Sequence, residues 1–363
     1  MSKILLIGHY GGDNFGDEIM LDSILSVIPS SDNVYVVTKQ PDKYGDTLSE
    51  KRTTFVSNSL FHILRAFLPS RILILGGGTH FHDDYTKSRY RKHRIYLLKI
   101  LLISFLMRMK GGKVLYIGVG YGPFLSKEIV FLSKLSVRLA NTIVVRDEES
   151  KDILDSIYHK KNKVYKGGDV SSMHPHFDVE KRPEKNEAIG ISLTSLNYSE
   201  GAASDSYWND TFFPAFISNY RSSSSKVKIF VFRGGDRESD YSLSLKLNNS
   251  LREIDESRVQ IIPFTYEVGR FVQEMTLCDR FIATRYHSAV LAYLSGADLL
   301  IVPYHRKLEG FSRDIHLPNE AILDISEKEM KSDVFKKFYT PAISRDNYIL
   351  DSKEVYKEIF EEL

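Results

Sequence analysis

The stretch KILLIGHYGGDNFGDEIMLDSILSVI, residues 3–28, passes from an apolar run through a glycine-rich segment into a helix-like segment. Continuous apolar, β-branched runs are typical of strands that are buried on both faces of a parallel sheet. A strand, a turn and a helix in this order are the repeating unit of doubly wound α/β domains. The stretch therefore predicts an α/β fold and puts the loop of residues 8–18 at the carboxyl end of the first strand.

The same alternation continues through the first half of the chain. Apolar runs predict further strands at residues 33–38, 71–76, 113–119, 142–146 and, with fewer apolar residues, 163–168. Helix-like segments occur between several of the strands, at residues 17–28, 87–110, 126–140 and 147–158. Together these segments predict a Rossmann-like N-terminal domain over residues 1–178.

A charged segment, FDVEKRPEKNE at residues 177–187, interrupts the alternation, and we interpret residues 179–187 as a linker. Beyond it, residues 202–225 predict a helix followed by a loop, and strands are predicted at residues 188–193, 226–232, 258–264, 280–285 and 298–304. A second Rossmann-like domain is expected over residues 188–340, followed by a helical tail over residues 341–363. Two such domains are expected to face each other across a cleft in which a ligand binds.

Composition and charge narrow the class of protein. The 363 residues include 49 Lys and Arg against 47 Asp and Glu, and this net charge of +2 argues against a broad nucleic-acid interface. The single cysteine, Cys278, excludes an intrachain disulfide framework and is typical of a reducing compartment. The apolar run before Gly8 is too short for a secretory signal, so a cytoplasmic location is expected.

The most apolar segment is YLLKILLISFLMRMK, residues 96–110. Its uncharged run between Lys99 and Arg108 is far shorter than the roughly 20 residues that span a bilayer. We interpret the segment as a buried helix with basic ends. The alternative is a peripheral contact with the inner face of a membrane, since apolar and basic side chains together suit such an interface.

The loop after the first strand, GHYGGDNFGDE at residues 8–18, contains no lysine or arginine. It has neither the GK[ST] ending of a Walker loop nor the G-x-G-x-x-G spacing of a dinucleotide-binding turn. Glycines allow a ligand to approach the backbone closely, and an uncharged or acidic loop suits hydroxyl groups better than phosphate. We expect a sugar there, held by Gly11, Gly12, Asn14 and Asp17; the alternative is a tight turn with a capping aspartate.

Two more glycine-rich segments follow predicted strands, GGGTHFHDD at residues 76–84 and GVGYGPF at residues 118–124. Ligands of open α/β sheets bind at the carboxyl ends of the strands. We therefore expect the same ligand at Gly77, Gly78, Gly120 and Tyr121. A metal site is the alternative for the first segment, but two histidines without a third histidine motif are a poor zinc signature, and we expect no metal at His80, His82, Asp83 and Asp84.

Arg146 ends a predicted strand in VVRDEES, residues 144–150. The guanidinium group presents a rigid fork that binds carboxylate or phosphate. The alternative is a structural ion pair with Asp147 or Asp169. The sequence leaves both interpretations open.

The second half contains the densest group of candidate residues, in IATRYHSAVLAYLSGADLLIVPYHRKLEGF at residues 282–311. Arg285 and His287 stand where a predicted strand meets a helix, and the N-terminus of a helix offers backbone N–H groups to an anion. Lys307 follows the next strand. A lone histidine is usually structural, but these three residue types together favour a functional site that binds an anion.

These motifs, in this order, resemble the polysaccharide pyruvyl transferase family. The matching stretches are GHYGGDNFGDE, GGGTHFHDD, GVGYGP, RDEES, GGDV at residues 167–170, TRYHSAVLAYLSG and YHRKLEGF. The resemblance implies a GT-B-like fold with two Rossmann-like halves. It also implies transfer of a pyruvyl group from phosphoenolpyruvate to a sugar as a cyclic ketal, with no further cofactor.

The resemblance further implies individual roles. His287 matches the proposed acid catalyst, and Arg146, Arg285 and Lys307 match residues that hold phosphoenolpyruvate. The N-terminal loop lies where the acceptor sugar is expected, whether on a surface glycan, a lipid-linked precursor or a nucleotide sugar. Residues 194–225 match no motif of the family. Two alternatives remain: a GT-B-like glycosyltransferase that uses a nucleotide sugar, and a sugar-binding relative without catalytic activity.

Overall fold

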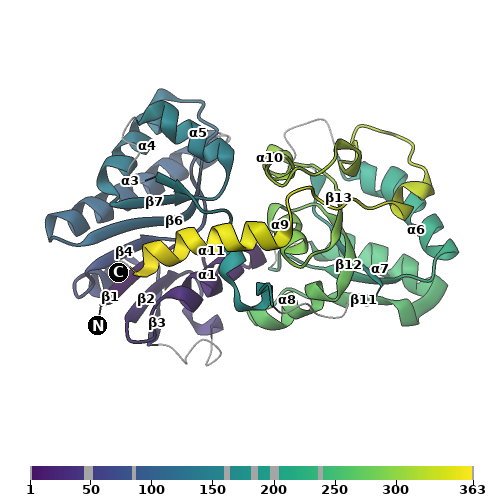
Figure 1. Cartoon of the computed structure of the whole chain (residues 1–363), viewed down its shortest axis with the longest axis horizontal. Coiled ribbons are helices and arrows are strands. Elements are labelled where there is room, and N and C mark those ends of the chain that lie inside the picture. The colour runs from purple at the N-terminus through teal and green to yellow at the C-terminus, as the bar shows by residue number, and fades with distance from the viewer. Residues whose placement is uncertain are drawn as a thin grey trace. The chain divides into compact units, whose positions relative to one another are not determined.

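The computed structural model describes residues 2–44, 52–83, 87–158, 164–180, 187–196, 204–235 and 240–361. The chain divides into two compact units (Figure 1). Unit 1 comprises residues 1–12, 17–175 and 350–363, and unit 2 comprises residues 13–16 and 176–349. Most of the predicted linker, residues 181–186, lies outside the described residues.

Unit 1 is built on a parallel sheet of eight strands. The order is β3-β2-β1-β4-β6-β7-β8, and β5 pairs with β6 outside this path. The strands are β1 (Lys3–Ile7), β2 (Asn33–Thr38), β3 (Thr53–Ser57), β4 (Ile72–Leu75), β5 (Gly78–Phe81), β6 (Lys113–Tyr121), β7 (Thr142–Val145) and β8 (Val164–Lys166). Successive strands extend first to one side of β1 and then, from β4 onward, to the other. This reversal makes the carboxyl ends of β1 and β4 the place where a ligand of this sheet is expected.

The helices of unit 1 are α1 (Phe15–Val27), α2 (Leu60–Phe67), α3 (Lys87–Met109), α4 (Lys127–Leu139), α5 (Glu148–Ile157) and the final helix α11 (Arg345–Glu361), which begins in unit 2. Ser126 caps α4 and Asp147 caps α5 by accepting hydrogen bonds from backbone N–H groups of the first turn. Figure 1 shows α3, α4 and α5 on one side of β6 and β7.

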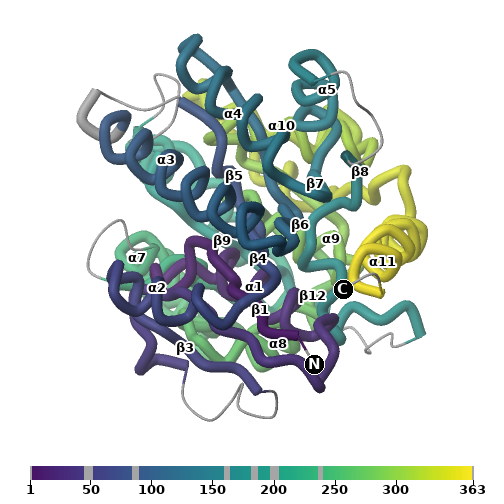
Figure 2. Tube along the Cα trace, turned by 90° about the vertical axis from the view of Figure 1, so that its left-hand side faces the viewer, coloured from purple at the N-terminus to yellow at the C-terminus, as the bar shows by residue number. Residues whose placement is uncertain are grey.

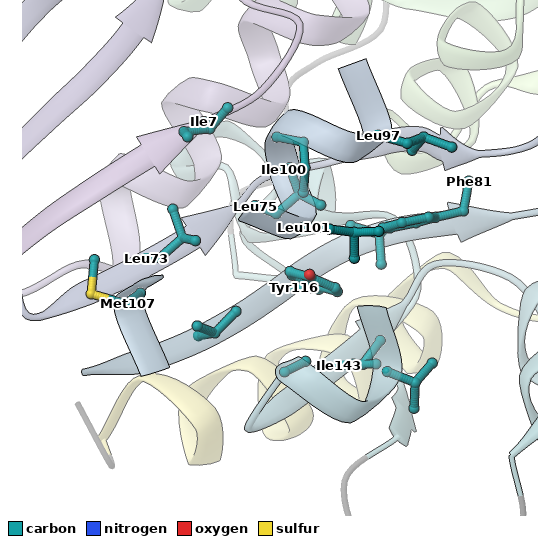
Figure 3. Close-up of a cluster of buried hydrophobic side chains, with 14 of the residues drawn as sticks. Ile7, Leu73, Leu75, Phe81, Leu97, Ile100, Leu101, Met107, Tyr116 and Ile143 are labelled. Atoms are coloured by element: carbon teal, nitrogen blue, oxygen red, sulfur yellow. The ribbon is translucent and has the colours of Figure 1, made fainter. Parts of the chain in front are cut away.

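The core of unit 1 forms between the sheet and these helices. Side chains from the strands, among them Leu75, Phe81 and Tyr116, pack with Leu97 and Leu101 of α3 (Figure 3). The strands are apolar on both faces because helices cover both faces of a doubly wound sheet. A rigid sheet of this kind fixes the positions of the loops at its carboxyl edge.

Unit 2 has a parallel sheet of five strands in the order β11-β10-β9-β12-β13. Its strands are β9 (Ala188–Ser192), β10 (Lys226–Phe230), β11 (Val259–Ile262), β12 (Cys278–Ala283) and β13 (Asp298–Ile301). Its helices are α6 (Phe213–Ser222), α7 (Tyr241–Asp255), α8 (Val268–Thr276), α9 (Tyr286–Leu294) and α10 (Arg306–Asp314). The chain order reverses between β9 and β12, so the carboxyl ends of those two strands mark the expected ligand position in this unit.

The α/β fold with two Rossmann-like parallel sheets is confirmed, and each predicted strand has a counterpart within a few residues. The sequence prediction missed β3, α2 and β5. In β3 the residues TTFVS are half-buried or exposed, so the strand lacks the continuous apolar run that identified the others. In β5 the flanking glycines suggested a loop.

Candidate functional site

The turn between β12 and α9 carries two of the predicted site residues, Arg285 and His287. The hydroxyl of Ser288 holds this turn, because it accepts a hydrogen bond from the backbone N–H of Arg285 at 3.0 Å and donates one to its carbonyl oxygen at 2.7 Å. Ser192, at the end of β9, donates a further hydrogen bond to Ser288 at 2.8 Å. The turn is therefore fixed at the reversal point of the unit 2 sheet.

His287 is half-buried in the first turn of α9. A Cβ atom at Gly16 would lie 2.0 Å from its Nδ1 atom, which is far inside van der Waals contact. Gly16 therefore leaves the space that the imidazole occupies. The ring of Tyr286 meets that of His287 edge-on at 5.1 Å between centroids.

Residues 13–16 of the N-terminal loop pack within unit 2. The N–H of Phe15 donates to the carbonyl of Phe232 at 2.8 Å, and the hydroxyl of Tyr266 donates to Oδ1 of Asp13 at 2.8 Å. The backbone of Asn14 forms an isolated antiparallel β-bridge with that of Arg233. The predicted acceptor loop is thus divided between the units: Asn14 belongs to unit 2, while Gly11, Gly12 and Asp17 belong to unit 1.

Arg285 is held by a buried carboxylate. Its Nε and Nη2 atoms donate to the two oxygens of Asp240 at 2.7 and 2.6 Å. Asp240 also accepts from the backbone N–H of Arg233 at 3.0 Å. The bonds to Asp240 use two of the five N–H groups of the guanidinium, and they fix the plane of the group at the start of α9.

Lys307 stands in the first turn of α10, which follows β13. Its backbone N–H donates to Nδ1 of His305, the capping residue, at 3.2 Å. Because β12 and β13 pair in parallel, α9 and α10 start from neighbouring strand ends. The ring of Tyr286 lies 5.9 Å from that of Phe311 on α10, so the helices that carry His287 and Lys307 are packed together.

In unit 1, Arg146 follows β7 and is buried. Its Nε donates to Asp147 at 3.1 Å, and its Nη2 donates to the hydroxyl of Thr79 on β5 at 2.8 Å. The structural ion pair is therefore present with Asp147, whereas Asp169 accepts hydrogen bonds from Ser171. A Cβ atom at Gly120 would lie 3.0 Å from the Thr79 hydroxyl oxygen, so this glycine leaves room for the pair.

The predicted acceptor residues of unit 1 fall into two groups. Gly11 and Gly78 have positive φ angles of 71° and 111°, which favour glycine, and a Cβ atom at Gly77 would lie 2.2 Å from the sulfur of Met20. Tyr121, by contrast, is buried in the core with its ring stacked on Phe81. Its hydroxyl is hydrogen-bonded to Ser136, and burial raises the pKa of this phenol well above its usual value.

His80 on β5 is buried and lies against half-buried His9 and Tyr96. Its Nε2–H donates to the carbonyls of Gly76 and Gly77 at 2.7 and 3.1 Å, and the Tyr96 hydroxyl donates to its Nδ1 at 2.8 Å. The His9 ring stacks on His80 at 4.7 Å. Burial lowers the pKa of His80 to about 4 and holds the pKa of His9 well below 6.5, so both rings are neutral at pH 7.

The described side chains include no group of three His, Cys, Asp or Glu that could hold a metal ion. His82 and His93 lie close, with ring centroids 4.8 Å apart, and Asp83 accepts hydrogen bonds from the backbone of Leu125 and Ser126. Asp84 lies outside the described residues.

Sequence reasoning missed Gly16 and Asp240 as neighbours of the candidate residues. Gly16 stood in the quoted loop, but no spacing linked it to His287, which follows β12 in a distant part of the sequence, although both residues belong to unit 2. Asp240 precedes α7 and carries no motif. Only a signal from paired changes in related sequences would have connected these positions.

Comparison with known proteins gives a family and a fold. A family model described as polysaccharide pyruvyl transferase matches residues 14–306. The structure of Anabaena Alr3699/HepE in complex with UDP and glucose is similar with a TM-score of 0.54 and 13% identity, and the match covers 100% of both chains. UDP-GlcNAc 2-epimerase from Methanocaldococcus jannaschii is similar with a TM-score of 0.58 and 8% identity over 99% of this chain and 100% of that one. At such identities these structures show a shared GT-B-like fold.

A curated relative matches a smaller part of the chain. Phosphoribosylaminoimidazole-succinocarboxamide synthase of Clostridium botulinum is 32% identical over 102 residues, which are 26% of this chain and 42% of that protein. The chain thus spans less than half the length of the curated relatives it matches.

Proposed function

The chain belongs to the polysaccharide pyruvyl transferase family, and from this premise we propose that it transfers a pyruvyl group from phosphoenolpyruvate to a sugar of a polysaccharide or its precursor. The product is a cyclic pyruvate ketal, and inorganic phosphate is released. The observation that carries the proposal is the Arg285–His287 turn, which holds an imidazole and a fixed guanidinium at the reversal point of the unit 2 sheet.

His287 is the proposed acid. Its imidazolium gives a proton to the methylene carbon of phosphoenolpyruvate, and a new C–H bond forms while positive charge develops at the neighbouring carbon. One sugar hydroxyl adds there and loses its proton. The bond to the phosphate oxygen then breaks, and a second hydroxyl closes the ring and loses its own proton. Histidine suits this task because its ordinary pKa of about 6.5 lies near working pH.

The proposed donor site uses cations and helix N-termini. The Lys307 ammonium and the first backbone N–H groups of α9 offer positive charge to the phosphate, since α9 and α10 begin at neighbouring strand ends. Arg285 contributes a guanidinium oriented by Asp240. Arg146, oriented by Thr79 and Asp147, is the proposed cation of unit 1. Such preoriented charges stabilise the departing phosphate.

The proposed acceptor site uses the strand-end loops of unit 1. The segment after β1 lacks cations, and its backbone is fixed by Glu18, which accepts from the N–H of Gly11 at 2.9 Å. The other residues proposed to bind sugar hydroxyls are Gly12, Gly77, Gly78 and Asp17. Asn14 from unit 2 belongs to the same proposal. A loop without cations suits the sugar, while the cations serve the donor.

A donor assay tests this function. Phosphate release from phosphoenolpyruvate is measured with galactosyl and mannosyl acceptors, and mass spectrometry detects the added ketal. His287→Asn is expected to lower kcat by about 10²- to 10⁴-fold, because proton transfer by a positioned acid contributes that much. His316→Asn is the control: His316 is exposed and has a positive φ angle of 52°, which asparagine tolerates.

Other outcomes identify the alternatives. Nucleotide release from a UDP-sugar without turnover of phosphoenolpyruvate indicates a glycosyltransferase. Sugar binding that His287→Asn leaves unchanged, with neither activity, indicates a binding protein. Either result refutes the proposed reaction.

A further inference from the structure

Helix α3 has apolar side chains on two opposite faces. One face, with Leu97, Ile100, Leu101 and Met107, is buried in the core of unit 1. The other is an exposed stripe that repeats at intervals of three and four residues, and it consists of Ile95, Leu98, Leu102, Phe105, Leu106 and Met109. The buried-helix interpretation of residues 96–110 therefore accounts for one face only.

The neighbouring helices extend this exposed apolar area. On and beside α2, Phe61 is 69% exposed and Leu68 is 75% exposed. Leu125 and Phe131, before and within α4, are 77% and 58% exposed. Figure 2 shows α3 between α2 and α4. We call the area the α3 surface, and it consists of the six stripe residues with Leu60, Phe61, Leu64, Leu68, Leu125 and Phe131.

Contacts between side chains join α3 to α2 and to α4. At one end, the Lys110 ammonium donates to the carbonyl of Phe67 at 2.6 Å and lies 4.0 Å from the centre of its ring. Toward the other end, Arg94 of α3 pairs with Glu128 of α4 at 3.3 Å. An open groove of about 430 Å³ lies along the start of α4, where Leu125 and Phe131 meet Lys127 and Lys134.

Positive charge accompanies these apolar side chains. The sequence of α3 contains no aspartate or glutamate, and neither does that of α2. The single acidic residue of α4, Glu128, is paired with Arg94. The exposed basic residues on these helices are Arg65, Arg91, Lys92, Lys99, Arg108, Lys127, Lys134 and Arg138.

This charge argues against a second copy of the chain as the occupant. Two α3 surfaces packed face to face would bring Lys99 and Arg108 close to the same cations of the partner, and like charges at an interface cost affinity. No described helix combines the length and the apolar character that crossing a bilayer requires. Apolar side chains bordered by lysine and arginine are instead typical of segments that lie in the interface of an anionic membrane.

We propose that the α3 surface docks on an anionic lipid bilayer. The apolar stripe enters the boundary between headgroups and acyl chains, while the basic side chains contact lipid phosphates. Such docking would bring unit 1 to a lipid-linked acceptor, but it does not depend on the reaction proposed above. Catalysis with a water-soluble acceptor therefore serves as an independent readout.

Co-sedimentation of the full chain with vesicles tests the docking. Binding is expected to vesicles that contain phosphatidylglycerol, and it should weaken with salt and with phosphatidylcholine alone. Leu102→Ser/Phe105→Ser is expected to lower the partition coefficient by about tenfold or more. The matched control is Leu245→Ser/Leu350→Ser, which removes two exposed leucines from α7 and α11.

A charge-reversal pair gives a second test. Arg65→Glu/Lys99→Glu is expected to weaken binding by about tenfold or more, since each basic residue near an anionic surface contributes about 1 kcal/mol. Lys331→Glu/Lys336→Glu, at exposed positions of unit 2, is the control. Circular dichroism verifies that each variant is folded. If the serine variant does not fold, the charge-reversal variant alone tests the docking.

Three results would overturn the proposal. The first is no binding to anionic vesicles. The second is equal binding by the α3-surface variants and their controls. The third is a dimer in analytical ultracentrifugation that Leu102→Ser/Phe105→Ser dissociates, which would assign the stripe to a second copy.

Discussion

The missing side chain of Gly16 determines where the imidazole of His287 can lie. Any Cβ atom there would overlap the ring, with a separation of 2.0 Å from Nδ1. Both residues belong to unit 2, although they are far apart in the sequence. The conformation of the proposed acid therefore depends on a glycine in the first turn of α1, near the start of the chain.

Gly16→Ala is expected to lower kcat strongly and to destabilise unit 2 by about 1–3 kcal/mol, because the ring or the loop must move. In a His287→Ala background the same substitution should cost little, since the ring is gone. Urea unfolding followed by the fluorescence of Trp208 measures the loss of stability in both backgrounds. The phosphate-release assay measures kcat. Gly269→Ala on α8, where a Cβ atom would lie 3.2 Å from His176, is the control.

An equal loss of stability from Gly16→Ala in both backgrounds would show that the alanine acts on the loop alone.

Arg285 also has a partner that is distant in the sequence. The sequence predicted that Arg285 binds the donor, and its side chain is also a partner of buried Asp240. A buried carboxylate of this kind needs its cation, because leaving a buried charge unpaired lowers the stability of the folded state by about 3 kcal/mol or more.

At the scale of elements, β5 is a strand in a glycine-rich segment that the sequence had suggested to be a loop. Gly78–Phe81 pairs with β6 and thereby puts His80 beneath the end of β1. Helix α3 covers the same group through Tyr96. Three elements thus enclose a neutral histidine whose two ring nitrogens are both hydrogen-bonded.

This enclosure makes the stability of unit 1 dependent on pH. The folded-state pKa of His80 is lowered to about 4, so the unfolded chain binds the proton more readily. Its contribution to stability is therefore present above pH 6.5 and is lost as the pH falls from about 6.5 to 4. Between pH 7 and 5 the free energy of unfolding should fall by about 2 kcal/mol more for the wild type than for His80→Gln.

Urea titrations at the two pH values, followed by far-UV circular dichroism, measure this difference. His316→Asn, at an exposed position, should behave as the wild type. If His80→Gln retains the full pH dependence, the stability change comes from other groups.

At the scale of the whole molecule, each of the two described units has a hydrophobic core of its own. Phe81 lies in the core of unit 1 and Phe216 in that of unit 2. The only tryptophan, Trp208, is buried in unit 2, where its indole N–H donates to the carbonyl of Thr194 at 2.9 Å. Tryptophan fluorescence therefore reports on unit 2, while far-UV circular dichroism reports on both units.

Phe81→Ala is expected to destabilise unit 1 by about 3–5 kcal/mol, the usual cost of such a cavity. In urea, circular dichroism should then show an early transition while the midpoint of Trp208 fluorescence stays in place. Phe216→Ala should instead shift the fluorescence midpoint. Coincident shifts in both signals for both variants would mean that the chain unfolds as one cooperative unit.

The sequence by itself predicted the α/β class, the repeated strand–helix alternation and the family. These features depend on local apolar runs and on motifs that are contiguous in the chain, such as TRYHSAVLAYLSG. The positions of Arg146, Arg285, His287 and Lys307 at strand ends followed from the same runs, because each residue stands directly after a strand or starts the next helix.

Tertiary structure alone decided the partners of these residues. The contacts of Gly16 with His287, of Asp240 with Arg285 and of Thr79 with Arg146 join segments that are separate in sequence. It also decided that the second apolar face of α3 remains exposed, since the sheet of unit 1 can cover only one side of that helix. A single sequence specifies which residues are apolar or charged, but the chain must fold before their neighbours exist.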